Sequence, residues 1–426
     1  MTRHYLLADV DNQQGMDMNE FRFVAAFAGL LTMVGAQAHG PAVSRYRITE
    51  VTPPASATAD CLAGYTRGAT INTINDFGVV NGTVQCYSQV DVAANILQYN
   101  TASFVAAPWF GAVELSQSVP GFTFSYTLNN RGEAFGYESP FETGGLYGTK
   151  WSLAGGLERV FDDPACENIR FSGAVDGNTR YTVGWALRPL PILLPFVLCV
   201  DNRWVIRDAA GVVTEGPLHG APYALNAVDV AVGTMEGSAI RYHLPSGQTR
   251  VLHAADPAHA AEATAINDLG EMAGRVTTNS VPDVYNQCDP SVAVRWDPNG
   301  TEHVLPHLPG AVSSHAFGVG YDGEVVGDSG AGQYCPYYDN SGERAVLWKD
   351  GRAWDLNSLI PRSAGVTLTY AFSVNRRGQI TASGYDTDEP LTQCAQSQPD
   401  PQTGMTVVTV SPCHLTRTYV LTPVGR

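Results

Sequence analysis

Short segments in which apolar and polar residues alternate, separated by turn-forming residues, run through most of this 426-residue chain. The clearest set lies within residues 262–305. Alternation in residues 262–266, 271–276, 291–296 and 301–305 is typical of half-buried β-strands. The sequences Asn-Asp-Leu-Gly and Asp-Pro-Asn-Gly separate the first and last pairs. Both favour tight hairpins, because Asn and Asp bond their own backbone and Gly adopts a positive φ. These residues predict four antiparallel strands joined as hairpins.

The Asn-Asp-x-Gly turn belongs to a motif that recurs about every 50 residues, which is the period of one propeller blade or solenoid coil. Clear copies occupy residues 74–82, 128–136, 266–274, 319–327 and 374–384. Degraded copies occupy residues 174–184 and 225–233. Seven units of four short strands predict an all-β protein with the β-propeller fold and seven blades. The poor third unit leaves six or eight blades open.

The two ends of the repeat region predict how the ring closes. The seventh unit ends soon after its third strand, residues 418–422, and lacks a fourth. Residues 45–51 alternate in the same way but belong to no unit. We expect this N-terminal strand to complete the last blade, because pairing the two would cover both exposed strand edges.

Aromatic residues keep register with the repeat. Four tryptophans precede the turn between the third and fourth strands of their units: Trp109, Trp151, Trp296 and Trp348. In the other units that position falls to Arg207, Tyr242 and Thr422. We interpret this series as packing between blades rather than as a ligand site.

Composition supports one repeat domain over residues 39–426. Charged residues are only 15% of the chain, whereas Gly (43) and Pro (26) are abundant, which suits a protein with many turns. The formal net charge of −16 argues against nucleic acid as a partner, because binding it relies on clustered Lys and Arg. We attribute the acidic surface mainly to solubility, with a cationic ligand as the alternative.

The N-terminal residues 1–38 have the pattern of an export signal that is removed. Arg22 precedes the apolar residues 23–34, and residues 36–38 (Ala-Gln-Ala) form a small-x-small cleavage site. The acidic residues before Met18 are atypical of a signal, so translation could start at Met1 or at Met18. Residues 189–200 are too short and too rich in proline to span a membrane. We expect a periplasmic or secreted protein with no membrane span after cleavage.

Eight cysteines follow the predicted signal: Cys61, Cys86, Cys166, Cys199, Cys288, Cys335, Cys394 and Cys413. An even number in an exported chain favours disulfides over metal binding or redox catalysis. The sequence does not fix their connectivity. Pairing sequence neighbours is one solution, and Cys288 with Cys335 would join equivalent loops of successive blades.

The repeats resemble the HAF-type extracellular repeat proteins of bacteria. The resemblance is clearest in residues 305–319 (LPHLPGAVSSHAFGV) and 354–361 (WDLNSLIP), and weaker copies extend it over most of residues 46–424. The resemblance implies an exported, propeller-like fold and no particular activity, and it supplies no catalytic residues. The cysteine-bearing insertions and the poor third unit depart from the family pattern.

Candidate catalytic motifs are weak. Residues 327–330 (Gly-Asp-Ser-Gly) match a serine-protease signature but have no companion motifs, so we interpret the match as chance. His303, His307 and His315 lie close in sequence, but extended chain denies them helical ligand spacing, and we interpret them as surface histidines. We therefore predict no catalytic residue, no cofactor and no metal.

The long loops suggest a binding face instead. Turns between strands 1–2 and 3–4 are short, whereas the opposite face carries insertions at residues 277–290, 328–343 and 385–412, close to all eight cysteines. Long loops braced on a rigid scaffold are where binding usually resides. The candidate contacts are Tyr285, Asn286, Tyr334, Tyr337, Tyr338, Asp339, Asp386 and Asp388. Variable surface braced against proteolysis would look the same.

Three functions remain open. The first is a monomeric, non-catalytic binding module whose ligand is a protein, a glycan or cell-envelope material. The second is a propeller hydrolase or lyase that acts on extracellular glycans from the long-loop face or the central channel. The third is a structural component of the envelope.

Overall fold

The computed structural model describes residues 43–59, 61–63, 66–118, 120–142, 145–153, 156–162, 172–189, 199–253, 259–277, 291–330, 342–399 and 406–425. These residues are almost entirely strand and turn. The predicted signal, residues 1–38, lies outside them.

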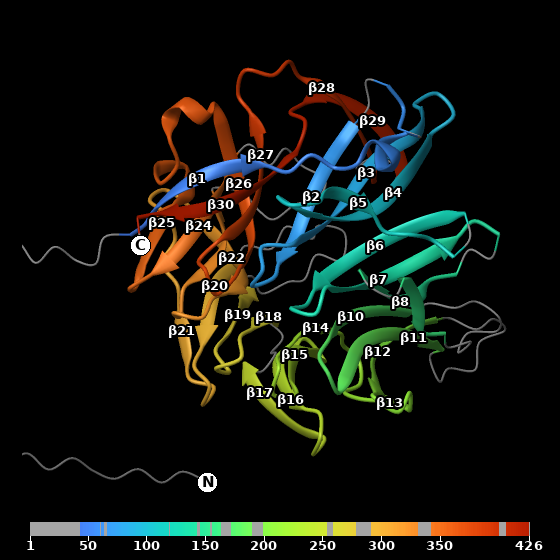
Figure 1. Cartoon of the computed structure of the whole chain (residues 1–426), viewed down its shortest axis with the longest axis vertical. Helices are drawn as coiled ribbons and strands as arrows, with labels where there is room; N and C mark the ends of the chain where they lie inside the picture. The colour runs from blue at the N-terminus through green and yellow to red at the C-terminus, as the bar shows by residue number, and fades with distance from the viewer. Residues whose placement is uncertain are drawn as a thin grey trace, which may run out of the picture. The chain divides into compact units, whose positions relative to one another are not determined.

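The described chain forms a β-propeller of seven blades, each a sheet of four antiparallel strands, as predicted (Figure 1). Blade 1 comprises β2 (Thr66–Ile74), β3 (Val80–Asp91), β4 (Ile96–Ala107) and β5 (Gly111–Glu114). Blade 2 comprises β6 (Gly121–Leu128), β7 (Glu133–Pro140), β8 (Tyr147–Ser152) and β9 (Gly156–Phe161). Blade 3 comprises β10 (Ser172–Gly177), β11 (Tyr181–Pro189), β12 (Cys199–Asp208) and β13 (Val213–Glu215). The degraded third unit is therefore a complete blade.

Blades 4 to 6 repeat the scheme. Blade 4 comprises β14 (Pro222–Leu225), β15 (Val230–Met235), β16 (Ser238–His243) and β17 (Gln248–His253). Blade 5 comprises β18 (Ala261–Ile266), β19 (Met272–Thr277), β20 (Ser291–Trp296) and β21 (Glu302–Val304). Blade 6 comprises β22 (Ser313–Val319), β23 (Val325–Gly330), β24 (Glu343–Lys349) and β25 (Arg352–Asp355). The strands of blade 5 match their sequence-based bounds to within two residues.

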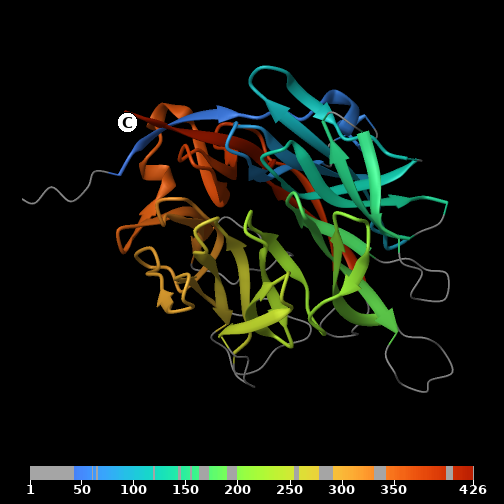
Figure 2. The same ribbon diagram turned by 60° about the horizontal axis from the view of Figure 1, so that its bottom comes forward.

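Blade 7 closes the ring with a strand from each end of the chain. Its order is β26 (Val366–Val374), β27 (Ile380–Asp386), β30 (Arg417–Val424) and β1 (Arg45–Glu50). Figures 1 and 2 both show β1 beside β30. Tyr46 of β1 is buried, and its backbone N–H donates to the carbonyl of Leu359. The predicted closure is confirmed.

Blade 7 also holds an insertion that the sequence indicated only as a long loop. Between β27 and β30, the strands β28 (Thr392–Pro399) and β29 (Thr406–Cys413) form a separate hairpin. The hairpin packs against blade 1, where Tyr87 of β3 contacts Ala395 and Val408. Disulfides join Cys394 to Cys413 within the hairpin and Cys61 to Cys86 beside it. Short 3-10 turns, η1 (Ala55–Thr58), η3 (Leu356–Ser358) and η4 (Arg362–Ala364), connect other elements.

The remaining predicted disulfide candidates stay predictions. Cys166, Cys288 and Cys335 lie outside the described residues, and Cys199 is placed only as the first residue of β12. Within the described part of the chain, no helix is long and apolar enough to cross a membrane.

Glycine is required at two positions of the motif, at the turn and at its last residue, for different physical reasons. Gly78 and Gly270 take φ of +87° and +83° at the turns, where other residues would be strained. The last glycine instead lies within the second strand, opposite a β-bulge in the first. A Cβ on Gly274 would stand 1.9 Å from the carbonyl oxygen of Glu262, and one on Gly136 would stand 1.7 Å from that of Phe124. This glycine therefore lets the bulge approach closely.

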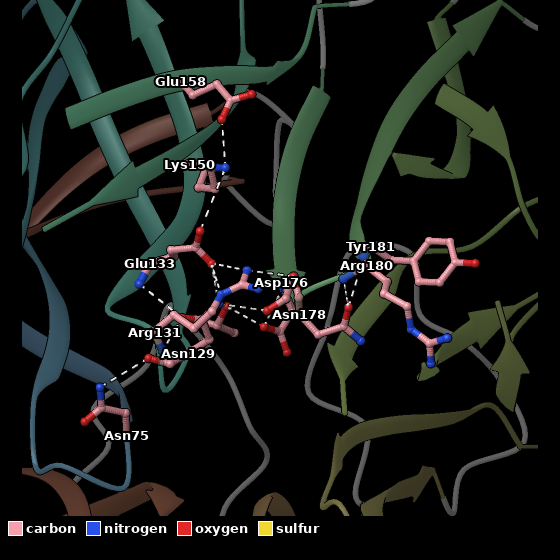
Figure 3. Close-up of polar contacts among 12 residues, drawn as sticks. Asn75, Asn129, Arg131, Glu133, Lys150, Glu158, Asp176, Asn178, Arg180 and Tyr181 are labelled. Carbon is pink, nitrogen blue, oxygen red and sulfur yellow. Dashed lines mark hydrogen bonds and ion pairs between the residues drawn. The ribbon is translucent and has the colours of Figure 1, made fainter. Parts of the chain in front are cut away.

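The motif asparagines link successive blades. The Oδ1 of Asn267 accepts hydrogen bonds from the backbone N–H groups of Leu269 and Glu271, which caps its own turn. Its Nδ2 donates to the carbonyl of Gly320 in the next blade at 2.7 Å. Equivalent donations from one blade to the next come from Asn75, Asn129, Asn178, Asn226 and Asn375. Figure 3 shows the link from Asn75 to Asn129. We call these six residues the asparagine ring.

The registered tryptophans pack between blades, with two corrections to the prediction. Trp151, Trp296 and Trp348 are at most 2% exposed, and the indole N–H of Trp348 donates to the carbonyl of Pro306. Trp109 is instead 62% exposed, because it lies in the turn after β4, and Ala106 holds the equivalent strand position. In blade 7 the equivalent residue is Leu421 rather than Thr422, since Leu421 pairs with Ile380.

Candidate functional site

The first strand of each blade lines a central cavity of about 900 Å³. One end of this cavity is bordered by the asparagine ring and its turns. Trp185, Glu262 and Arg275 line the cavity toward its other end. A cavity of this size falls within the range of small-molecule sites. The cavity is therefore the candidate site.

A β-bulge in each first strand directs one extra side chain into this cavity. Bulges re-aim side chains and are frequent next to functional sites. The bulged residues, in blade order, are Asn72, Tyr126, Val175, Tyr223, Thr264, Phe317 and Phe372. All seven line the cavity, and four are aromatic.

The first aromatic wall, on blades 2 and 3, comprises Phe124, Tyr126, Tyr137 and Trp185. The ring centroids of Phe124 and Tyr137 lie 5.6 Å apart in stacked geometry, and those of Phe124 and Tyr126 lie 5.0 Å apart. Trp185 lies over Gly173, where a Cβ would stand 2.7 Å from the indole. Burial raises the pKa of Tyr126 and Tyr137, so both phenols stay protonated. The wall presents an apolar surface with hydroxyl donors at its edge.

The second aromatic wall, on blades 6 and 7, comprises Phe317, Tyr370 and Phe372. The centroid of Phe317 lies 5.8 Å from that of Phe372, and the rings of Tyr370 and Phe372 are stacked at 6.0 Å. Blade 1 separates the two walls on one side, and blades 4 and 5 separate them on the other. The walls therefore flank the cavity from different sides of the ring.

An ion pair on blade 5 lies between the walls. The Nε of Arg275 lies 2.9 Å from Oε2 of Glu262, and both residues line the cavity. Their side chains are 25% and 30% exposed, so the pair is reachable. It presents guanidinium donors and carboxylate acceptors together with no net charge.

Behind this pair, blade 6 buries three ionisable residues. The Nδ1 of His315 lies 3.0 Å from Oδ2 of Asp328, and Glu343 lies beside Asp328. All three residues are at most 4% exposed. Burial lowers the pKa of His315 to about 4, so the imidazole is neutral. Burial also raises the pKa of Asp328 and of Glu343, because two adjacent carboxylates in a dry site retain a proton.

The opposite end of the cavity is acidic. Asp176 accepts hydrogen bonds from the backbone N–H groups of Gly177 and Leu225, and burial raises its pKa to about 6. Arg376 lies 2.8 Å from Asp268 and 3.2 Å from Asp76, and its guanidinium stands over the ring of Tyr321. Among the residues that line this end, the three carboxylates of Asp76, Asp176 and Asp268 outnumber the two guanidiniums of Arg131 and Arg376 by one charge.

The sequence-predicted contacts are only partly placed. Tyr285, Asn286, Tyr334, Tyr337, Tyr338 and Asp339 lie outside the described residues. Their loops begin after Thr277 and Gly330, two residues beyond Arg275 and Asp328. Asp386 and Asp388 are described, and the carboxylate of Asp386 caps the backbone N–H of Asp388. Neither of these two aspartates lines the cavity.

Two weak motifs now have structural explanations. Ser329 of the protease-like signature is buried, and its hydroxyl donates to the carbonyl of Ser313. Because His315 pairs with the preceding residue, Asp328, the side chain of Ser329 lies on the opposite face of the sheet from His315. The prediction of surface histidines holds for His303, which is 44% exposed, but is wrong for His315, which is fully buried. The extended strand turned His315 inward, because it lies two residues before the bulge at Phe317. Among the described residues, no group of three or more His, Cys, Asp or Glu could hold a metal ion.

Sequence reasoning missed the cavity residues, although a signal for them exists. Each bulged residue lies three positions before the asparagine of its repeat, or before Gly320 in blade 6. Four of the seven units have an aromatic residue at this one position. The position could therefore have been found by aligning the seven units on the motif.

Neither a protein-family model nor a curated protein sequence matches this chain. Among solved structures, it is similar to an oligogalacturonate lyase in complex with manganese, with 12% identity, a TM-score of 0.45, and 90% of this chain and 94% of that chain covered. It is similar to the acylaminoacyl peptidase of Pyrococcus horikoshii, with 10% identity, a TM-score of 0.46, and coverage of 78% and 56%. It is also similar to a streptogramin B lyase, with 12% identity, a TM-score of 0.33, and coverage of 89% and 98%. At these values none of the similarities bears on what this chain binds.

Proposed function

We propose that this chain is an exported, disulfide-braced propeller of the HAF type that acts as a non-catalytic binding module, with its ligand in the central cavity. The signal-like residues 1–38 and the disulfides Cys61–Cys86 and Cys394–Cys413 support export, since such bonds persist in oxidising compartments. The long-loop face remains the expected route of entry, because its insertions start beside the ionic side of the cavity.

The observation that carries the proposal is the pair of aromatic walls around a cavity of about 900 Å³. Phe124, Tyr126 and Trp185 line it from blades 2 and 3, and Phe317 and Phe372 line it from blades 6 and 7. Apolar pockets with few convergent polar groups are the usual form of a small-molecule site. A purely structural channel has no need of aromatic side chains directed inward by bulges.

The test compares two tryptophans. Immobilised protein would be exposed to solubilised envelope fractions, with Trp185→Ala as the cavity variant and Trp109→Ala as the exposed control. We expect Trp185→Ala to retain at least tenfold less material and Trp109→Ala to match the unmodified protein. A third variant without residues 334–339 reports on the long-loop face. Equal retention of envelope material by all variants would show that the cavity is not the binding site.

A second candidate function is a hydrolase or lyase acting on extracellular glycans. The observation that favours it is the carboxyl pair of Asp328 and Glu343, buried behind Glu262 and Arg275, whose raised pKa values would keep a carboxyl protonated near neutral pH. If the protein is an enzyme of this kind, Asp328→Asn will abolish product formation and leave retention unchanged. If the unmodified protein retains a glycan but forms no product from it, the enzyme alternative fails and only the binding function remains.

A further inference from the structure

Resting on the proposed function, we propose that the ligand is an uncharged pyranose ring of a glycan, stacked against the aromatic walls with its hydroxyl edge on Glu262 and Arg275. Three features of the cavity favour such a ligand: the walls, the ion pair and the charge at the far end.

The walls match the faces of a sugar ring. A pyranose carries C–H groups on its faces and hydroxyls around its edge, so it combines a flat apolar surface with polar rims. Trp185 lines the cavity and packs on Gly173, where a Cβ would come within 2.7 Å of the indole, so the strand offers the ring a close seat. Aromatic side chains bury large apolar area and keep polar atoms at their edges.

The ion pair matches the edge of the ring. Neighbouring hydroxyls need both a donor and an acceptor, and Glu262 with Arg275 supplies both at 2.9 Å from each other. Thr264, the bulged residue of the same blade, lines the cavity beside them. A hydrocarbon ligand would displace water from these polar groups without adding a hydrogen bond to them, which is unfavourable in a largely apolar site.

The charge around the cavity disfavours an anionic sugar. Glu262 and Arg275 cancel each other, while at the far end three aspartates outnumber two arginines by one charge: Asp76, Asp176 and Asp268 against Arg131 and Arg376. The whole chain carries a net charge of −16. A uronate would therefore meet repulsion both on approach and within the cavity, whereas a neutral ring would not.

The experiment titrates the full chain with cellotetraose and maltotetraose as neutral probes and with tetragalacturonate as the anionic probe. Binding would be followed by calorimetry and tryptophan fluorescence. We expect a neutral probe to bind, Trp185→Ala and Glu262→Gln each to weaken it at least tenfold, and Trp109→Ala to leave it unchanged. Saturation-transfer NMR on the unmodified protein should carry magnetisation from aromatic protons to the sugar C–H protons, which needs no variant to fold.

The outcomes separate the two proposals. Envelope material retained through Trp185 without binding of either neutral probe would overturn the sugar inference and leave the binding module intact. Tighter binding of tetragalacturonate than of the neutral probes would also overturn it. If Trp185→Ala changes neither the retention of envelope material nor the binding of the probes, both the binding module and this inference are overturned.

Discussion

The side-chain Nδ2 of Asn375 donates a hydrogen bond to the backbone carbonyl of Asn75, which is 300 residues away in the chain and 2.9 Å away in space. This contact joins blade 7 to blade 1 at the turn end of the cavity. The Oδ1 of Asn375 accepts hydrogen bonds from the backbone N–H groups of Arg377 and Gln379. One amide thus shapes its own turn and holds the next blade.

We predict that Asn375→Asp destabilises the protein by about 2 kcal/mol, because a buried carbonyl loses its donor and faces a carboxylate instead. The matched control is Asn299→Asp. Asn299 caps only the backbone and hydroxyl of Thr301 in an exposed turn, so its acceptor oxygen is kept and the change should be near zero. Chemical denaturation measures both. Equal losses would mean that the link between blades contributes nothing.

We expect Gly274→Ala to cost about 3 kcal/mol, because its Cβ would stand 1.9 Å from the carbonyl oxygen of Glu262. The same substitution at Gly342, where a Cβ would meet nothing within 4 Å, should change stability little. Thermal unfolding of the two variants checks the difference. Similar melting temperatures would show that the bulge relaxes freely.

The buried ionisable residues of blade 6 predict an unusual pH dependence. Burial raises the pKa of Asp328 to about 8, so the folded state holds a proton that the unfolded state has released. Its stabilising contribution is complete only below the unfolded carboxyl pKa, and it is lost as the pH rises through 8. The lowered pKa of His315, about 4, acts in the opposite direction between about pH 4 and 6.5.

Above pH 6.5 the carboxyl contribution therefore stands alone. We expect the free energy of unfolding to fall between about pH 6.5 and 8, by at most about 1.4 kcal/mol per pH unit for one proton. Asp328→Asn should flatten this fall. Denaturation series at closely spaced pH values provide the measurement. A flat profile in the unmodified protein would show that the pair is ionised when folded.

Closure by β1 makes a further prediction. Tyr46 is 6% exposed and packs into the core cluster of blades 6 and 7, so Tyr46→Ala should cost about 3 kcal/mol. Arg47→Ala, on the exposed side of the same strand, should cost little. Deleting residues 45–50 should abolish cooperative unfolding or cause aggregation, because β30 would become an open edge. A soluble, cooperatively folded deletion product would contradict this role of β1.

The turns explain why the fold could be predicted from the sequence. Asn267 and Gly270 encode a hairpin locally, and seven repeats of that local rule leave little choice of architecture. Closure followed from β1 having no unit of its own. The register of blade 7 was harder to predict, because Leu421 rather than Thr422 pairs with Ile380 and so takes the inter-blade position.

The cavity could not be predicted in the same way. Whether Tyr126 or Phe317 faces the cavity depends on one extra residue in the strand, and a bulge leaves no local turn signal. His315 illustrates the consequence, because its polar type indicated surface while the strand directed it inward beside Asp328. The pairing of Glu262 with Arg275 likewise depends on the register between β18 and β19, which only the folded sheet defines.

The asparagine ring has a consequence for how this protein tolerates mutation. Each of its six residues donates to a main-chain carbonyl of the next blade, and any amino acid supplies such a carbonyl. The carbonyls of Gly177 and Gly320 accept these hydrogen bonds just as the carbonyl of Asn129 does. A unit can therefore drift in sequence, as the third has, and still be held by its predecessor. A blade that loses its asparagine, as blade 6 has at Gly320, is still held by the blade before it. The inward-facing bulge positions take no part in these links and are free to vary separately.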